Sequence, residues 1–139
     1  MTETVLPLLL LDTNILSYLY RGHPLAESYM VRLEGYSTLI AFQTVAELRY
    51  GMEKANWGER RRSDQERFMG RFRTIYPTDS VCTQWARAVA SARRAGQPID
   101  TADAWIAATA LALKCPLVTH NAADFAGVPN LNIISEQSA

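Results

Sequence analysis

The chain has 139 residues, with 14 acidic and 14 basic side chains, so its formal net charge is zero. This length suits one domain with a single hydrophobic core, and the neutral charge argues against a protein that coats nucleic acid without selectivity. No apolar run approaches the ~20 residues of a membrane span, and the apolar N-terminus is too short for a secretory signal and carries Glu3 in place of a basic region. We therefore expect one domain spanning residues 1–139 in the cytoplasm, with Cys82 and Cys115 reduced and buried.

Short apolar runs alternate with segments of helical periodicity along the whole chain. In chain order, the predicted elements are a strand at 8–11, helices at 14–20 and 25–34, a strand at 38–42, helices at 44–56 and 59–73, a strand at 74–76, helices at about 80–95 and 101–114, and strands at 116–119 and 131–134. For the helix near residue 80, Asp79 or Ser80 is the expected N-cap, and for the next helix it is Asp100 or Thr101. The alternation predicts an α/β fold with a mostly parallel sheet.

Charge is unevenly distributed along the chain. The segment from Trp57 to Thr74 holds six arginines, Arg60, Arg61, Arg62, Arg67, Arg71 and Arg73, against three acids. Beyond Gln97, by contrast, acids outnumber basic residues. One surface is thus expected to be basic while another region concentrates carboxylates.

Four acidic residues lie where a parallel α/β sheet places its active sites, outside the carboxyl ends of the strands. Asp12 follows LLLL directly, Glu47 lies one helical turn beyond TLIAF, and Asp124 follows PLVT in a loop. Asp103 lies in the first turn of the helix that leads into PLVT. If the fold brings these regions together, the four carboxylates form an acidic pocket.

Each of these acids also has a purely structural explanation. Asp12 could cap the following helix, and Asp124 could cap a turn in NAADF. Thr44 and Glu47 have the spacing of a capping box, but a Glu47 carboxylate that points into the pocket leaves Thr44 to cap alone, and this second arrangement is the expected one. Asp103 would be favoured near a helix N-terminus by the helix dipole. Taken together, however, converging carboxylates without basic partners repel one another and raise each other's pKa values. A divalent cation bound by oxygen ligands, Mg²⁺ or Mn²⁺, would relieve this repulsion and suits phosphodiester hydrolysis.

Polar residues beside the acids are candidates to orient them. Thr13 and Asn14 follow Asp12, and Thr119 and Asn121 precede Asp124. Their hydroxyls and amides could hold the carboxylates or a metal-bound water, although ordinary cap and turn chemistry explains them equally well. The two histidines are weaker candidates, because His23 lies in a Gly-His-Pro turn and His120 has no evident orienting partner.

Four segments in fixed order, LLLLDTNIL, TVAELRYGMEKA, PIDTADAWIAATAL and LVTHNAADF, resemble the PIN domain, and more closely the VapC toxins of type II toxin–antitoxin systems. The resemblance implies a three-layer α/β/α sandwich and a Mg²⁺- or Mn²⁺-dependent endoribonuclease. The family's acids carry over onto Asp12, Glu47 and Asp103. The fourth carries over less directly, since many relatives have an acid where this chain has Asn121, and Asp124 is the carboxylate at hand.

The same resemblance implies partners and a substrate. It implies a homodimer, a VapB-like antitoxin that blocks the site, and cleavage of structured RNA, with transfer RNA as one candidate, which inhibits translation. A groove formed by the first two helices is expected to bind the antitoxin through Leu16, Leu19, Tyr20 and Tyr29. Candidate contacts to RNA phosphates are Arg49, Arg60, Arg61 and Arg62, which a solvated, salt-bridged helix would explain equally well.

Three other functions compete with this prediction. A haloacid-dehalogenase-type phosphatase needs a second Asp where this chain has Asn14, and a phosphoacceptor receiver domain needs an acid pair and a late Lys that the chain does not offer. A catalytically inactive RNA- or protein-binding module with the same fold remains the alternative, although the intact set of acids weighs against it.

Overall fold

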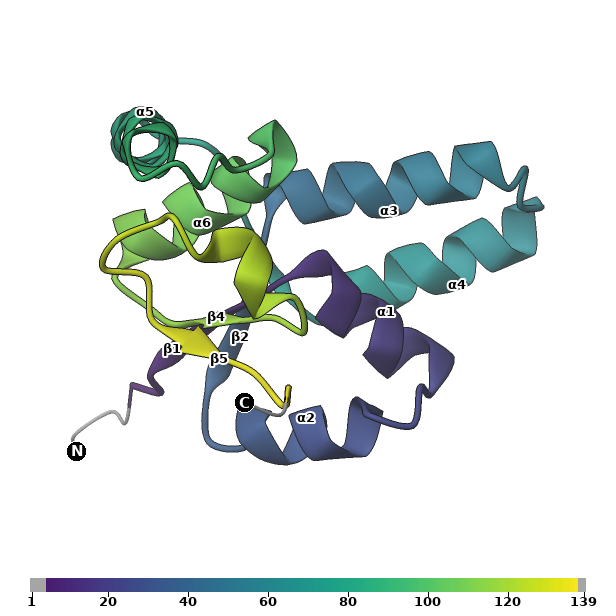
Figure 1. Cartoon of the computed structure of the whole chain (residues 1–139). Helices are drawn as coiled ribbons and strands as arrows, with labels where there is room; N and C mark the ends of the chain where they lie inside the picture. Colours follow the sequence, from purple (N-terminus) through teal and green to yellow (C-terminus); the bar gives the residue numbers. More distant parts are fainter. Residues whose placement is uncertain (1–4, 138–139) are drawn as a thin grey trace.

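The computed structural model describes residues 5–137, and Figure 1 shows its strands at the centre with helices around them. The elements are β1 (Leu8–Leu11), α1 (Thr13–Arg21), α2 (Ala26–Leu33), β2 (Ser37–Ala41), α3 (Phe42–Lys54), α4 (Glu59–Met69), β3 (Arg73–Ile75), α5 (Asp79–Arg94), α6 (Thr101–Leu113), β4 (Leu117–Val118), the short 3-10 helix η1 (Ala122–Phe125) and β5 (Ile133–Ile134). Among the described residues, no helix is long and apolar enough to span a membrane.

The five strands form one parallel sheet in the order β3-β2-β1-β4-β5, which confirms the predicted α/β architecture. β1 is central: Leu11, its last residue, pairs with Ile40 of β2 and with Val118 of β4. All four positions of β1 are leucine, which fits a central parallel strand that is covered on both faces.

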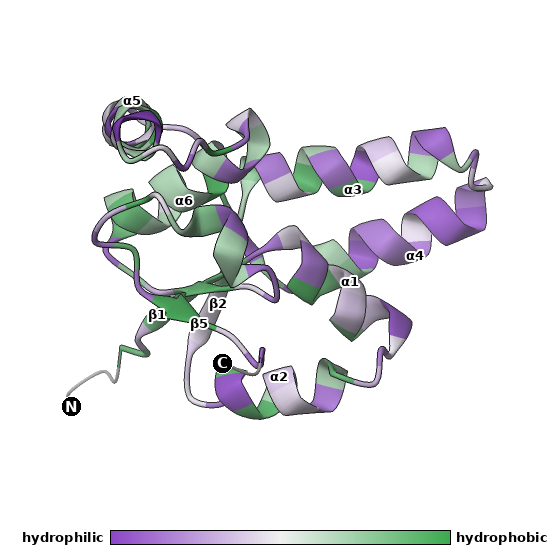
Figure 2. Ribbon diagram, in the orientation of Figure 1, coloured by the Kyte–Doolittle hydropathy of each residue, from purple (hydrophilic) through white to green (hydrophobic). Residues whose placement is uncertain are grey.

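Helices cover both faces of the sheet, giving the three layers that the resemblance implied. Leu10 faces a core cluster that includes residues of α5, α6 and η1. Leu9 and Leu11 face the other cluster, which includes residues of α1, α2, α3 and α4. Figure 2 shows β1 and β5 in the colour of apolar residues and α4 largely in that of hydrophilic ones.

The capping box that the spacing of Thr44 and Glu47 allows is not formed. The expectation that Thr44 caps the helix alone is also wrong. Helix α3 begins at Phe42, two residues earlier, and its N-cap Ala41 has no side chain that could bond to the helix backbone. The chain passes from β2 into the helix without a loop, so Thr44 lies inside the first turn and is fully buried. Its Oγ1 instead lies 3.0 Å from Oγ1 of Thr13, which ties α3 to α1.

Other boundaries also differ from prediction in local detail. Thr78, not Asp79 or Ser80, caps α5, since its Oγ1 accepts a hydrogen bond from the Val81 N–H at 3.3 Å. Asp100 is the N-cap of α6, as expected, but makes no side-chain cap hydrogen bond. The arginine-rich helix α4 ends at Met69 and not at Arg73, because Arg73 already belongs to β3.

The two cysteines differ in environment. Cys115 is buried in the core, as expected, whereas Cys82 is exposed on α5, so the prediction that both are buried is wrong for Cys82. Neither forms a disulfide. Because α5 covers the sheet with only one face, a residue in this helix can be apolar and still point to solvent.

Helices α3 and α4 extend together from the body as a paired arm (Figure 1). The Arg49 guanidinium of α3 forms two hydrogen bonds with the Glu66 carboxylate of α4, at 2.8 and 3.1 Å. The buried amide of Gln65 donates to the Leu48 carbonyl at 3.2 Å. These contacts hold the two helices of the arm together.

Candidate functional site

Asp12 lies at the carboxyl end of the central strand and is almost completely buried. Its Oδ1 accepts the Thr13 N–H at 2.8 Å, so it does cap α1. Its Oδ2 accepts a short hydrogen bond from the Thr119 hydroxyl, at 2.6 Å, and a longer one from the Asn14 amide, at 3.3 Å. Both oxygens are therefore held in place, by donors at the start of α1 and by a hydroxyl that follows the neighbouring strand β4.

Glu47 lies on the first half of α3 and is half-buried. The Gln43 amide, one turn earlier, donates to its Oε1 at 3.1 Å. Glu47 also lines a groove, described below, to which α1 contributes Thr13. The carboxylate is thus free of the helix start and is directed by a side-chain amide.

Asp103 and Asp124 share an open pocket of about 340 Å³ with Asp100. Asp103 is in the first turn of α6, and Asp124 belongs to η1, the short helix that replaces the predicted loop. The sequence predicts Asp100 only as a helix cap, yet it also lines this pocket. The N-terminus of α6 therefore brings one more acid to this region than the motif suggested.

The two halves of the site interact electrostatically. Burial raises the pKa of the Asp12 carboxyl above its usual range, and the Glu47 and Asp124 carboxylates raise it further, against the hydrogen bonds from Thr119 and Thr13. Partial burial raises the pKa of Asp103 to about 7, and Asp12 and Asp124 contribute the next largest effects. All four predicted acids thus lie close enough to influence one another, and protons or cations are favoured between them.

In the part of the chain that the structure describes, no basic side chain forms an ion pair with this cluster. Among residues 5–137, the ion pairs join Arg32 to Glu136, Arg49 to Glu66, Arg62 to Glu53 and Arg67 to Asp64, and none includes Asp12, Glu47, Asp103 or Asp124. Over the same residues, no three Asp, Glu, His or Cys side chains are arranged so that they could hold a metal ion directly. The acids form a region of negative potential without a closed set of ligands.

Asp103→Asn should raise the thermal stability of the metal-free protein at pH 8. Because the raised pKa makes the folded protein hold a proton that the unfolded chain has lost, stability falls as the pH rises from about 4 to about 7. The uncharged amide of the variant removes this loss of folding free energy. Because the carboxyl is only half-buried, solvent screening limits the gain to about 1 kcal/mol, equivalent to a Tm increase of about 4 °C. Thermal melts in EDTA from pH 4 to 8 test this prediction, and equal melting temperatures at pH 8 would contradict it.

The predicted orienting residues are brought to the acids to different degrees. Asn14 and Thr119 bond to Asp12 through their side chains, and Thr13 does so through its backbone N–H, as described above. Asn121 is exposed, and its backbone N–H donates to the Thr119 Oγ1 at 3.0 Å, so it supports Thr119 and does not bond directly to an acid. The hydroxyl of Thr119 therefore both accepts from Asn121 and donates to Asp12.

His120 has the orienting partner that the sequence did not reveal. Its Nδ1 lies 2.6 Å from the hydroxyl of the fully buried Tyr29, which is 91 positions away along the chain. A contact at that separation leaves no local pattern in the sequence. His23 remains a turn residue, since its Nδ1 accepts the Leu25 N–H at 3.0 Å.

The four candidate arginines for RNA lie in or beside the arm formed by α3 and α4. Arg49 is paired with Glu66, and Arg62 bonds to the Glu53 carboxylate and the Trp57 carbonyl, both at 2.6 Å. Arg61 lies over the Trp57 ring, 3.8 Å from its centre, and is exposed. Arg60 is also exposed. Two of the four thus brace the arm.

The expected antitoxin residues are only partly available at the surface. Tyr29 is fully buried and Leu16 nearly so, which makes the prediction wrong for Tyr29 as a surface contact. Leu16 instead forms part of a groove of about 380 Å³ between α1, α3 and α4. Its other lining residues include Tyr20, Glu47, Leu48, Trp57, Arg61 and Phe68.

Known proteins with similar sequences and structures point to one family. The family model described as PIN domain matches residues 9–131. Ribonuclease VapC1 of Haemophilus influenzae is 32% identical over 124 residues, which cover 88% of this chain and 92% of that protein. A tRNA(fMet)-specific endonuclease VapC of Shigella flexneri is 29% identical over 122 residues, 88% of this chain and 92% of that protein. The VapBC2 complex of Rickettsia felis bound to promoter DNA contains a chain with a TM-score of 0.82 and 26% identity, covering 94% of this chain and 99% of that one. The family model matches most of the chain, and VapC ribonucleases match it over nearly their full length. The chain therefore belongs to the PIN-domain family and, within it, to the VapC ribonucleases.

Proposed function

We propose that this protein is a metal-dependent endoribonuclease that acts as the toxin of a type II toxin–antitoxin system in the cytoplasm, with residues 1–139 as its single domain. The observation that carries the proposal is the set of four acids at the carboxyl edge of the sheet. Glu47 and Asp124 contribute to raising the pKa values of Asp12 and Asp103, and none of the four has a basic partner among the described residues. The resemblance to ribonucleases of the VapC family supports the same reaction class.

Asp12, Glu47, Asp103 and Asp124 would hold the cation, and the all-oxygen donor set fits Mg²⁺ or Mn²⁺. Because the acids do not form a closed ligand set, some of them would act through water, which Mg²⁺ retains readily. When bound, the ion would supply charge stabilisation at the scissile phosphate and an activated water. Thr119, Thr13 and Asn14 orient the Asp12 carboxylate, and Gln43 orients that of Glu47.

Cleavage of RNA by the purified protein with and without divalent cation tests this function. We expect cleavage in Mn²⁺ or Mg²⁺, loss of at least about 100-fold of the rate in EDTA, and recovery when the cation is restored. The products should carry 5′-phosphate and 3′-hydroxyl ends. Undiminished cleavage in EDTA would contradict metal dependence. No cleavage under any condition, together with retained RNA or protein binding, would favour the inactive binding module.

We further propose structured RNA as the substrate, with transfer RNA as one candidate. The tRNA(fMet)-specific name of a relative and the exposed arginines beside the groove support this choice. Inhibition of translation would follow from cleavage of such an RNA. Of the four candidates, Arg60 and Arg61 are the better phosphate contacts. Among the described residues, Arg49 and Arg62 already form ion pairs, and Arg62 also bonds to a carbonyl, whereas Arg60 and Arg61 do neither.

Arg61→Ala should weaken binding to RNA in a salt-dependent way. Loss of one phosphate contact lowers the slope of log affinity against log salt by about 1. Arg67→Ala is a suitable control, since Arg67 lies on the same helix and is paired with Asp64 at 3.6 Å. Titrations of a catalytically inactive variant over a roughly sixfold range of salt concentration measure the slope, and an unchanged slope would remove Arg61 from the interface.

The groove between α1, α3 and α4 is the proposed seat of a VapB-like antitoxin. It combines apolar and aromatic side chains with polar ones and includes Glu47, so a bound segment would cover that acid. Solved VapBC complexes among the structural neighbours support an antitoxin partner. Co-expression with the product of an adjacent small reading frame, followed by size-exclusion chromatography and cleavage assays, tests both the complex and the expected homodimer.

A further inference from the structure

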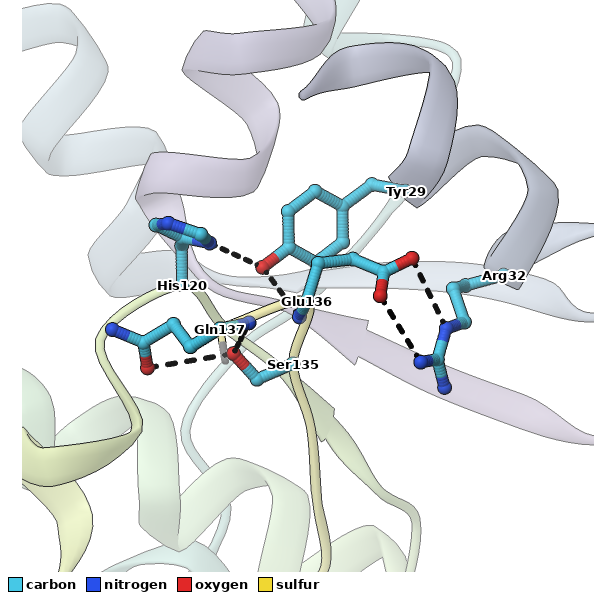
Figure 3. Close-up of polar contacts among 6 residues, drawn as sticks. All are labelled: Tyr29, Arg32, His120, Ser135, Glu136 and Gln137. Carbon is cyan, nitrogen blue, oxygen red and sulfur yellow. Dashed lines mark hydrogen bonds and ion pairs between the residues drawn. The ribbon is translucent and has the colours of Figure 1, made fainter. Parts of the chain in front are cut away.

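The C-terminal segment 135–137 crosses two parts of the fold that are distant in sequence, α2 and the loop 119–122 (Figure 3). It follows β5, the edge strand beside β4. The Thr119 N–H donates to the Ile134 carbonyl at 3.0 Å, and the Ala122 N–H donates to the Gln137 Oε1 at 2.9 Å. The chain from Ile134 to Gln137 thus holds both ends of the loop that supplies Thr119 and His120.

Tyr29 joins this segment to the loop from inside the fold. Its side chain is fully buried, and its hydroxyl accepts the Glu136 N–H at 3.0 Å and lies 2.6 Å from Nδ1 of His120. A backbone N–H can only donate, so the hydroxyl accepts that bond and still has its proton and a second lone pair for the bond to His120.

Figure 3 shows a second tie on the outer side of the same segment. The Arg32 guanidinium of α2 contacts both oxygens of Glu136, at 3.1 and 3.3 Å. Arg32 is about half exposed, so this ion pair adds little stability compared with the buried Tyr29 hydroxyl. The internal bond is expected to set the position of the segment.

From His120 the hydrogen bonds continue to the acidic site. The backbone N–H of His120 donates to Asn14 Oδ1 at 3.2 Å. This bond fixes the Asn14 amide so that its nitrogen faces Asp12 Oδ2 at 3.3 Å. Thr119, the residue before His120, donates to the same oxygen. Both donors to Asp12 Oδ2 therefore depend on the position of residues 119 and 120.

We propose that Tyr29 is a positioning residue that couples the C-terminal segment to Asp12, through His120, Thr119 and Asn14. The proposal rests on the proposed function, because it takes Asp12 as a ligand of the catalytic cation. Without the Tyr29 hydroxyl, the His120 Nδ1 and the Glu136 N–H lose their partner, and the loop carrying Thr119 and His120 loses its inner support. Mutation of a residue that orients a metal ligand in this way typically lowers metal affinity or activity 10- to 100-fold.

Tyr29→Phe tests the proposal, with the surface substitution Tyr36→Phe as its matched control. We expect Tyr29→Phe to lower both Mn²⁺ affinity, measured by calorimetry, and kcat for RNA by about tenfold, with KM within about twofold and an unchanged circular dichroism spectrum. A variant that loses only thermal stability, with wild-type Mn²⁺ affinity and kcat, would overturn the proposal.

A second pair of variants covers the case in which the buried substitution disturbs folding. Glu136→Pro removes the N–H that bonds to Tyr29, whereas Glu136→Ala keeps it and removes only the ion pair. The proline variant should lower Mn²⁺ affinity several-fold and the alanine variant should leave it within about twofold. Equal affinities for the two would overturn the proposal.

A spectroscopic measurement separates this coupling from the proposed nuclease function. In the metal-free protein, Tyr29→Phe should shift the nitrogen NMR signal of His120 Nδ1 and the Asn14 side-chain amide signals. Absence of Mn²⁺ binding and RNA cleavage in the wild type would refute the nuclease function alone. Unchanged Asn14 signals in Tyr29→Phe would refute the coupling.

Discussion

Asp12→Asn should lower RNA cleavage at least about 100-fold and abolish growth inhibition, while the protein remains folded. The buried carboxylate is the central acid of the site, and its negative charge is what a divalent cation would bind. Asn is as good an N-cap as Asp, and its oxygen can still accept the Thr13 N–H. The Asn14 NH₂ group and the Thr119 hydroxyl would then face an NH₂ group in place of Asp12 Oδ2. The hydroxyl can accept a hydrogen bond from it, whereas the Asn14 NH₂ group cannot.

Cleavage rates in Mn²⁺ and growth after induced expression measure this effect. Asp103→Asn should give a loss of similar size, with the higher metal-free stability derived above. Asp64→Asn is a matched control on the exposed face of α4, where the residue is paired with Arg67. Full activity of both site variants would refute the assignment of these acids as ligands.

Glu47→Gln should cost activity about 10- to 100-fold with almost no change in stability. Because α3 begins at Phe42 and Thr44 bonds to Thr13, Glu47 plays no part in the helix cap. The Gln43 amide donates to Glu47 Oε1, and the amide oxygen of the substituted side chain could accept the same bond. Only the negative charge is lost, so the change in unfolding free energy is expected to stay within about 0.5 kcal/mol.

Parallel measurement of RNA cleavage and thermal unfolding tests this separation. Glu53→Gln on the same helix is the control: its exposed carboxylate binds Arg62 of α4. A Glu47→Gln variant with wild-type activity would exclude Glu47 from the site. A large loss of stability would show that the carboxylate supports the fold after all.

Much of the fold could be predicted from local patterns. The apolar run at residues 8–11 is confirmed as the central strand β1, and all the predicted strands and helices exist. The errors lie at the boundaries, where several residues can cap. In α3 the absence of a loop after β2 overrode the Thr44–Glu47 spacing, and in α5 Thr78 took the place of Asp79 or Ser80. For Cys82, helical periodicity did not tell which face of α5 covers the sheet.

The sequence by itself determined that acids follow the strand ends, and the order of its motifs determined the family. Those features are local, because a strand's apolar run and the residue after it are consecutive in the chain. Only the tertiary structure decided that the pKa of Asp103 rises to about 7 and that Asp100 shares its pocket. Only it joined Tyr29 to His120 and Glu136, 91 and 107 positions away. Hydrogen bonds and burial depend on distance in space, and residues so far apart in the chain meet only once the sheet has formed and both its faces are covered.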